Sequence, residues 1–133
     1  METRYRFAEH GGEVELELDA PTEAGVFEAA VEAFAELVSD EDAGETARHE
    51  IELAGSDRAL LLVDTLNELV FLTETARFVP ERLESLELRD DRLRATVAGR
   101  RGHPRPLVKA VTLNKLELTG SGGAWHGRVV LDV

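Results

Sequence analysis

Residues 13–18 alternate strictly between glutamate and an aliphatic residue, and this pattern constrains the fold more than any other segment. Side chains along a β-strand point in turn to opposite faces of the sheet, so a period of two places Val14, Leu16 and Leu18 on one side. The segment therefore predicts a half-buried strand with a row of carboxylates on its other face. The Gly-Gly pair at 11–12 predicts a turn just before it.

Two amphipathic helices are expected. Pro21-Thr22 starts the first, with Thr22 as N-cap. One face carries its large apolar residues and the opposite face three glutamates, and these are Phe27, Val31, Phe34, Val38 and Glu28, Glu32, Glu36. Ser56 or Asp57 caps the second helix, which runs to about residue 74. Because this helix is apolar over a wide arc, we expect a sheet or a partner to cover most of it.

The rest of the chain is rich in short strand patterns, expected at 4–7, 46–53, 76–79, 83–89, 92–99, 108–119 and 125–132. Asp90-Asp91 and the glycine-rich run 120–123 mark hairpin turns. Two helices among many strands, with hairpins late in the chain, indicate an α+β fold with a mixed or antiparallel sheet packed on the helices. A length of 133 residues predicts one domain spanning 1–133.

Charge and composition exclude several classes of function. The chain has 27 acidic and 15 basic residues, for a net charge of −12, which disfavours direct binding to nucleic acids or to anionic membranes. It has no cysteine, which removes disulfides and thiolate chemistry. No apolar run is long enough for a membrane span, and no signal peptide is visible, so we expect a cytoplasmic protein.

Carboxylates are the strongest candidates for site chemistry. No serine lies in a Gly-x-Ser-x-Gly elbow, and the four histidines form no metal-binding pair. Glu13 follows the Gly-Gly turn, and Asp132 precedes the terminal carboxylate of Val133. Oxygen donors of this kind suit Ca²⁺ or Mg²⁺. The solvated face that Glu13 shares with Glu15 and Glu17 explains the same residues equally well.

Two longer motifs resemble the archease family. Residues 107–114 (Leu-Val-Lys-Ala-Val-Thr-Leu-Asn), with Trp125 and the ending Val-Val-Leu-Asp-Val, are similar to its Val-Lys-Ala-Val-Thr-Tyr-His run and hydrophobic-Asp-Ile terminus. Residues 61–72 resemble its Leu-Leu-x-x-Trp-Leu-Asn-Glu-Leu-Leu-Tyr helix. Phe-Ala-Glu-His at 7–10 stands where the family has its Glu-His-Thr-Ala-Asp-Val opening.

The resemblance implies a strand-helix-strand-strand unit with a second such unit inserted. It also implies a chaperone-like accessory factor, not itself an enzyme, that helps a tRNA-splicing RNA ligase become guanylylated and turn over repeatedly. The implied divalent metal is Ca²⁺ by preference, with Mg²⁺ or Mn²⁺ as alternatives. Its implied ligands are Glu13, Asp132 and the Val133 carboxylate, with Asp40 at the same acidic corner. His10 and Lys109 are expected to support the site or to contact the partner.

Departures from the family pattern keep other functions open. Thr-Ala-Asp is replaced by Gly11-Gly12-Glu13, Tyr-His by Leu113-Asn114, and the helix tryptophan by Thr65. The alternative is a metal-free archease-like adaptor or chaperone that acts through protein–protein contacts. A carboxylate-dependent hydrolase is a third hypothesis, and the oligomeric state stays open.

Overall fold

Local signals at the helix starts form as the sequence predicts. The Thr22 hydroxyl accepts the Gly25 N–H at 3.0 Å, and the Asp57 carboxylate accepts the N–H groups of Ala59 and Leu60 at 3.0 and 3.2 Å.

A computed structural model describes residues 1–133. Its elements are β1 (Arg4–His10), β2 (Glu13–Ala20), α1 (Glu23–Val38), β3 (Thr46–Ala54), α2 (Arg58–Thr75), β4 (Phe78–Arg89), β5 (Arg92–Arg101), β6 (Ala110–Ser121) and β7 (Ala124–Asp132).

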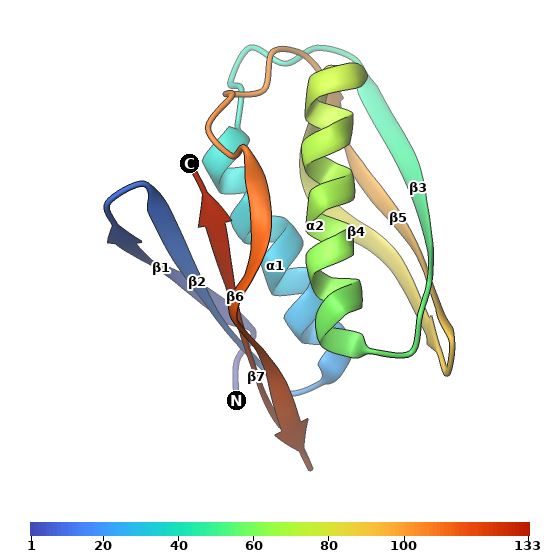
Figure 1. The fold of residues 1–133 in the computed structure, drawn as a ribbon. Coiled ribbons are helices and arrows are strands. Elements are labelled where there is room, and N and C mark those ends of the chain that lie inside the picture. The colour runs from blue at the N-terminus through green and yellow to red at the C-terminus, as the bar shows by residue number, and fades with distance from the viewer.

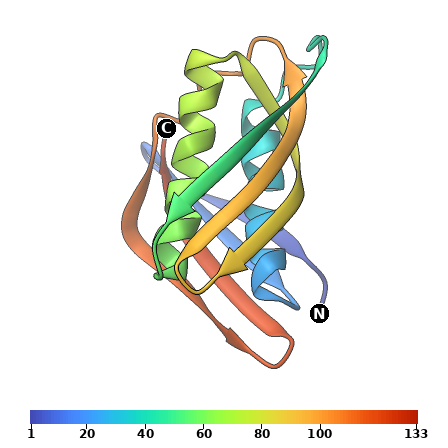
Figure 2. The same cartoon turned by 90° about the vertical axis from the view of Figure 1, so that its right-hand side faces the viewer.

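The strands form two antiparallel sheets rather than a single sheet. One has the order β1-β2-β7-β6 and the other the order β3-β5-β4. Both helices lie between the two sheets (Figures 1 and 2), which explains why α1 buries most of its surface. No parallel pairing occurs, so the mixed-sheet alternative does not hold.

The topology contains one strand-helix-strand-strand unit inside another, as the resemblance implies. The outer unit is β2-α1-β6-β7, and the inserted unit is β3-α2-β4-β5. In each unit the last strand lies between the first two, giving β2-β7-β6 and β3-β5-β4. The outer unit gains β1 through a hairpin. This arrangement brings the start of β2 to the end of β7, although they are separated by nearly the whole chain.

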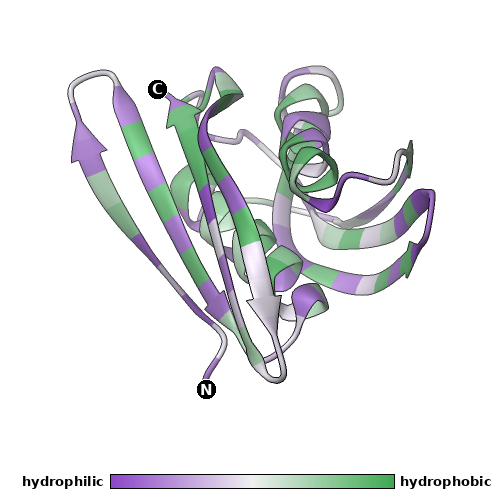
Figure 3. Cartoon of the chain, turned by 60° about the horizontal axis from the view of Figure 1, so that its bottom comes forward, coloured by the Kyte–Doolittle hydropathy of each residue, from purple (hydrophilic) through white to green (hydrophobic).

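The core fills the space between the layers. Twenty-seven buried residues form one cluster that includes both helices and both sheets, with Phe27, Phe34 and Phe78 its largest members. Figure 3 shows the alternation of hydrophilic and hydrophobic residues along β2. Its aliphatic residues enter the core, and its acidic residues face outward, as expected.

One pair of expected strands is a single strand. The segments expected at 76–79 and 83–89 are joined in β4, which passes Pro80 with register shifts at Pro80/Arg82 and Leu83/Ser85. A proline has no N–H to donate to a neighbouring strand, but a bulge in an edge strand accommodates it.

Neither α1 nor α2 combines the length and the apolar character that a membrane-spanning helix needs.

Candidate functional site

The outward face of β2 carries four carboxylates in a row, and three of them have an arginine partner. The paired three are Asp19 with Arg4 at 3.5 Å, Glu17 with Arg6 at 3.5 Å, and Glu15 with Arg128 at 3.7 Å. His126 adds contacts of 3.0 Å to Asp19 and 3.5 Å to Glu17. Each of these three acids therefore has a cationic partner within the sheet, although Arg128 also pairs with Glu117 of β6 at 3.0 Å.

Glu13, the fourth acid of the row, has no cationic partner and faces another acid that has none. Strand register places Glu13 directly opposite Asp132 of β7. The Val133 N–H donates to the Gly12 carbonyl at 3.0 Å, which makes this a non-hydrogen-bonded pair, the closer of the two antiparallel kinds, with Cα atoms about 4.5 Å apart. Like charges at such positions destabilise a sheet. A bound cation would remove that repulsion.

Backbone hydrogen bonds hold this end of β7 on both sides. The terminal residue is tied to Gly12, and the Lys109 N–H donates to the Asp132 carbonyl at 2.8 Å. These hydrogen bonds hold the backbone of Asp132 and the Val133 N–H in place between β2 and the segment before β6. Lys109 itself is exposed and has no ion pair.

His10 lies beside the carboxylate pair. It is opposite Glu13 in the β1–β2 register, so His10, Glu13, Asp132 and Ala110 occupy one row across the four strands. Its nearest acidic contact is Glu15, with 3.7 Å between Nε2 and Oε2. The structure therefore brings three of the expected side chains, His10, Glu13 and Asp132, to one end of the sheet.

Asp40 is not part of this row, and backbone N–H groups from two different segments engage its carboxylate. Its carboxylate accepts the His103 N–H at 2.7 Å and the Asp42 N–H at 3.0 Å. These two hydrogen bonds, the His103 one foremost, hold the pKa of Asp40 below its ordinary value. No group of three His, Asp or Glu side chains is gathered in a form suited to a metal ion. Asp40 serves here to join the loop after α1 to the segment after β5.

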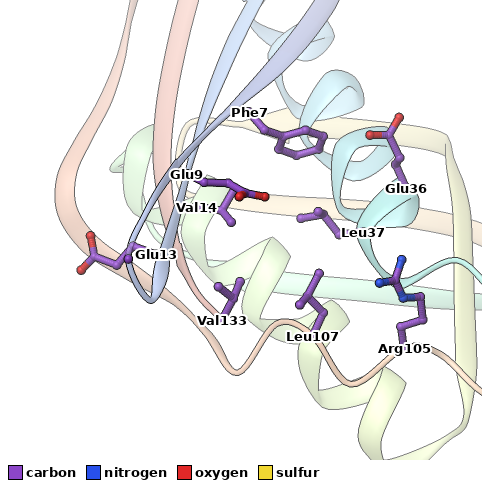
Figure 4. Close-up of a pocket in the computed structure, with 10 residues that line it drawn as sticks. Phe7, Glu9, Glu13, Val14, Glu36, Leu37, Arg105, Leu107 and Val133 are labelled. Carbon is purple, nitrogen blue, oxygen red and sulfur yellow. The ribbon is translucent and has the colours of Figure 1, made fainter.

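A cavity of about 370 Å³ adjoins the carboxylate pair. It lies between the β1–β2 hairpin, the last turn of α1 and the segment before β6 (Figure 4). The Val133 side chain lines it, whereas Glu13 points away from it. The carboxylate pair and the cavity are thus neighbouring but separate features.

Asn67 has a role that sequence analysis did not identify. Its side-chain amide donates to the Val111 carbonyl at 3.0 Å and accepts the Val111 N–H at 2.9 Å. These bonds join α2 to β6, the edge strand next to Asp132. The only sequence signal is the Asn-Glu pair in an otherwise apolar helix.

The chain is similar to known proteins over nearly its whole length. The model of the archease protein family matches residues 5–133. The chain is 33% identical to "Protein archease" of Methanosarcina mazei, over 98% of this chain and 96% of that one. The solution structure of protein 1598 from Methanobacterium thermoautotrophicum has a TM-score of 0.71 at 29% identity, covering 97% and 98% of the two chains. A Thermotoga maritima structure described as an archease and possible chaperone has a TM-score of 0.69 at 18% identity, covering 95% and 94%.

Proposed function

Because this chain belongs to the archease family, we propose that it is a metal-binding accessory factor that promotes guanylylation and multiple turnover of a tRNA-splicing RNA ligase. In this proposal the ligase carries out the bond chemistry and the accessory factor does not. The cytoplasm is the proposed location.

The observation that supports metal binding is the unneutralised pair Glu13 and Asp132. Every other acid of the β2 row has an arginine, so these two carboxylates are available for a cation. Both stand where the resemblance expects ligands, and the Val133 carboxylate adds a further oxygen donor. Hard divalent cations prefer such oxygens, and Ca²⁺ accepts irregular arrangements of them more readily than Mg²⁺ does.

The chain's own residues would hold the metal at the end of the sheet and present it to the partner. A divalent ion supplies positive charge that polarises or positions anionic oxygen groups. The pairing of β2 with β7 fixes the separation of the two carboxylates, and His10 flanks them. The net charge of −12 favours a partner with a basic surface and disfavours direct contact with RNA.

Thermal unfolding of metal-stripped protein tests the metal site. With about 1 mM Ca²⁺ and a dissociation constant near 10 μM, the ion should stabilise the fold by roughly 2.7 kcal/mol. For a domain of this size that is a rise in melting temperature of about 8–12 °C. Mg²⁺ and Mn²⁺ are compared in parallel.

Three variants test whether the metal binds at Glu13 and Asp132. Glu13→Gln and Asp132→Asn keep side-chain size and should each abolish most of the rise. Glu28→Gln removes one equally exposed charge from α1 and should leave the rise intact. A rise that persists in both site variants would place the metal elsewhere.

The ligase assay tests the rest of the proposal. Purified ligase from the same organism should show faster guanylylation and more turnovers when the wild-type protein and metal are added. The Asp132→Asn variant should be much less effective. Unchanged ligase kinetics with wild-type protein would refute the accessory role.

A second candidate function is a metal-free adaptor or chaperone. It is favoured by Asp40, whose carboxylate accepts the N–H groups of His103 and Asp42, leaving two side-chain acids at the pair. It predicts no change in melting temperature with any divalent ion and a principal partner other than the ligase. Recovery of the ligase as the main bound protein would count against it.

A further inference from the structure

The cavity beside the carboxylate pair has an apolar wall that the proposed metal site does not use. Five hydrophobic side chains from five different segments line it, and they are Phe7, Val14, Leu37, Leu107 and Val133. Only Val14 among them belongs to the fully buried core; the others are partly exposed. The hollow therefore exposes apolar surface that a partner could cover.

One free carboxylate lies at the rim of this cavity. Glu9, Glu13 and Glu36 are among the lining residues, and Arg105 is the one cation there. Glu36 accepts a hydrogen bond from the Tyr5 hydroxyl at 3.1 Å, and Glu13 points away. Glu9 has neither an ion pair nor a hydrogen-bonded side-chain partner, and Figure 4 shows its carboxylate above Val14, directed toward Leu37. Glu9 is thus the free acid at the cavity.

We infer that this cavity binds a lysine or arginine side chain of a partner protein. The aliphatic stem of such a side chain packs on apolar surface while its charged head stays at the rim, which matches an apolar wall with a free carboxylate above it. Arg105 repels a cation, so the charged head must lie on the Glu9 side. If the proposed function holds, the basic residue belongs to the ligase.

A side chain docked in the cavity would lie close to the carboxylate pair. The Val133 side chain lines the cavity, and Val133 directly follows Asp132 in the chain. A basic side chain seated on Val133 therefore brings the partner's surface to the carboxylate pair. Docking at the cavity and metal presentation at the pair would then involve one continuous face.

Binding of amino-acid amides, followed by methyl NMR, tests the cavity without the ligase. N-acetyl-arginine amide should shift the methyl signals of Leu37, Leu107 and Val133 in a saturable way. N-acetyl-norleucine amide, which has a similar stem and no charge, should bind more weakly. Glu9→Gln should weaken arginine amide binding by about two- to fivefold, the range of an exposed ion pair. Glu28→Gln is the matched control and should bind like the wild type.

Three results would overturn the inference. These are an absence of saturable methyl shifts, equal binding of the norleucine and arginine amides, and unchanged binding by the Glu9→Gln variant. Glu9 is exposed at a strand end, so its replacement should not unfold the protein.

Association with the ligase separates this inference from the proposed function. Glu9→Gln and Leu107→Asn should weaken binding to the ligase while the metal-induced rise in melting temperature stays as in the wild type. If the wild type binds the ligase and both variants bind equally well, the cavity is not the docking site. If the wild type does not bind the ligase, the proposed function fails, and the amide titration alone decides whether the cavity takes a basic side chain.

Discussion

Replacing Asn67 should destabilise the fold more than any other change at a half-exposed polar residue. β6 is an edge strand, so the N–H and C=O of Val111 that face away from β7 have no strand partner. Val111 is only 5% exposed, and the Asn67 amide satisfies both groups. Leucine at position 67 would leave a buried donor and a buried acceptor without partners.

The expected cost follows from those two groups. A buried polar group that loses its partner costs about 1–3 kcal/mol, so the two groups together should lower the free energy of unfolding of Asn67→Leu by about 2–6 kcal/mol. At about 4 °C per kcal/mol, the melting temperature should fall by about 8–24 °C. Asn114→Leu is the control, because the exposed Asn114 side chain makes no hydrogen bond; it should change stability by less than about 0.5 kcal/mol.

The stability of the Asn67→Asp variant should depend on pH. An ionised carboxylate can accept the Val111 N–H but repels the Val111 carbonyl, whereas a protonated one can donate to it. The pKa of the introduced aspartate should therefore rise on folding, and the stability deficit of the variant should shrink as pH falls toward that pKa. Chemical denaturation at several pH values and hydrogen exchange of the Val111 amide measure both effects. A loss below about 0.5 kcal/mol in Asn67→Leu, with unchanged Val111 exchange, would refute this account of the contact.

Three further substitutions test other parts of the structure. Gly12→Ala should raise the free energy of unfolding by about 0.4–1 kcal/mol and tighten Ca²⁺ binding. Gly12 has no positive φ, and a Cβ there would meet nothing closer than 4.0 Å. An unchanged or lower melting temperature would contradict this. Gly99→Ala should lower the free energy of unfolding in urea by about 1–3 kcal/mol, since its Cβ would overlap the Val79 carbonyl oxygen. Wild-type stability would show that β4 shifts at little cost. The hydrogen bond from His126 holds the pKa of Asp19 below its ordinary 3.8, so this contribution to stability is present above that pH and is lost as pH falls through the lowered value. Asp19→Asn should accordingly show a shallower acid loss of stability than wild type, and parallel acid curves would count against the pairing.

The sequence predicted the elements that local chemistry determines. The period-two pattern before Ala20 and the caps Thr22 and Asp57 act within a few residues, so they can be recognised without knowledge of the fold. The single strand β4 was missed because Pro80 ordinarily interrupts a strand, and only its edge position permits the bulge.

The candidate site depends on long-range pairing, which the residues alone do not specify. The resemblance named Glu13 and Asp132 as ligands, but nothing in their local sequence brings residues 13 and 132 together. The link from Asn67 to β6 was missed for the same reason, since its partner lies 44 residues away. The separation of Asp40 from the pair likewise reflects two hydrogen bonds in a loop whose partner segment follows β5.

The nested repeat shows that the carboxylate pair belongs to particular residues and not to the fold. The inserted unit has the same strand order as the outer unit, and the start of β3 meets the end of β5 as the start of β2 meets the end of β7. At the equivalent position of the inserted unit, Thr46 of β3 lies opposite Arg100 of β5, and neither residue is acidic. Opposed carboxylates at that position are thus not required for two such strands to pair. The repulsion between Glu13 and Asp132 occurs in the outer unit only, and this is why we propose that a metal would bind at that end of the β1-β2-β7-β6 sheet.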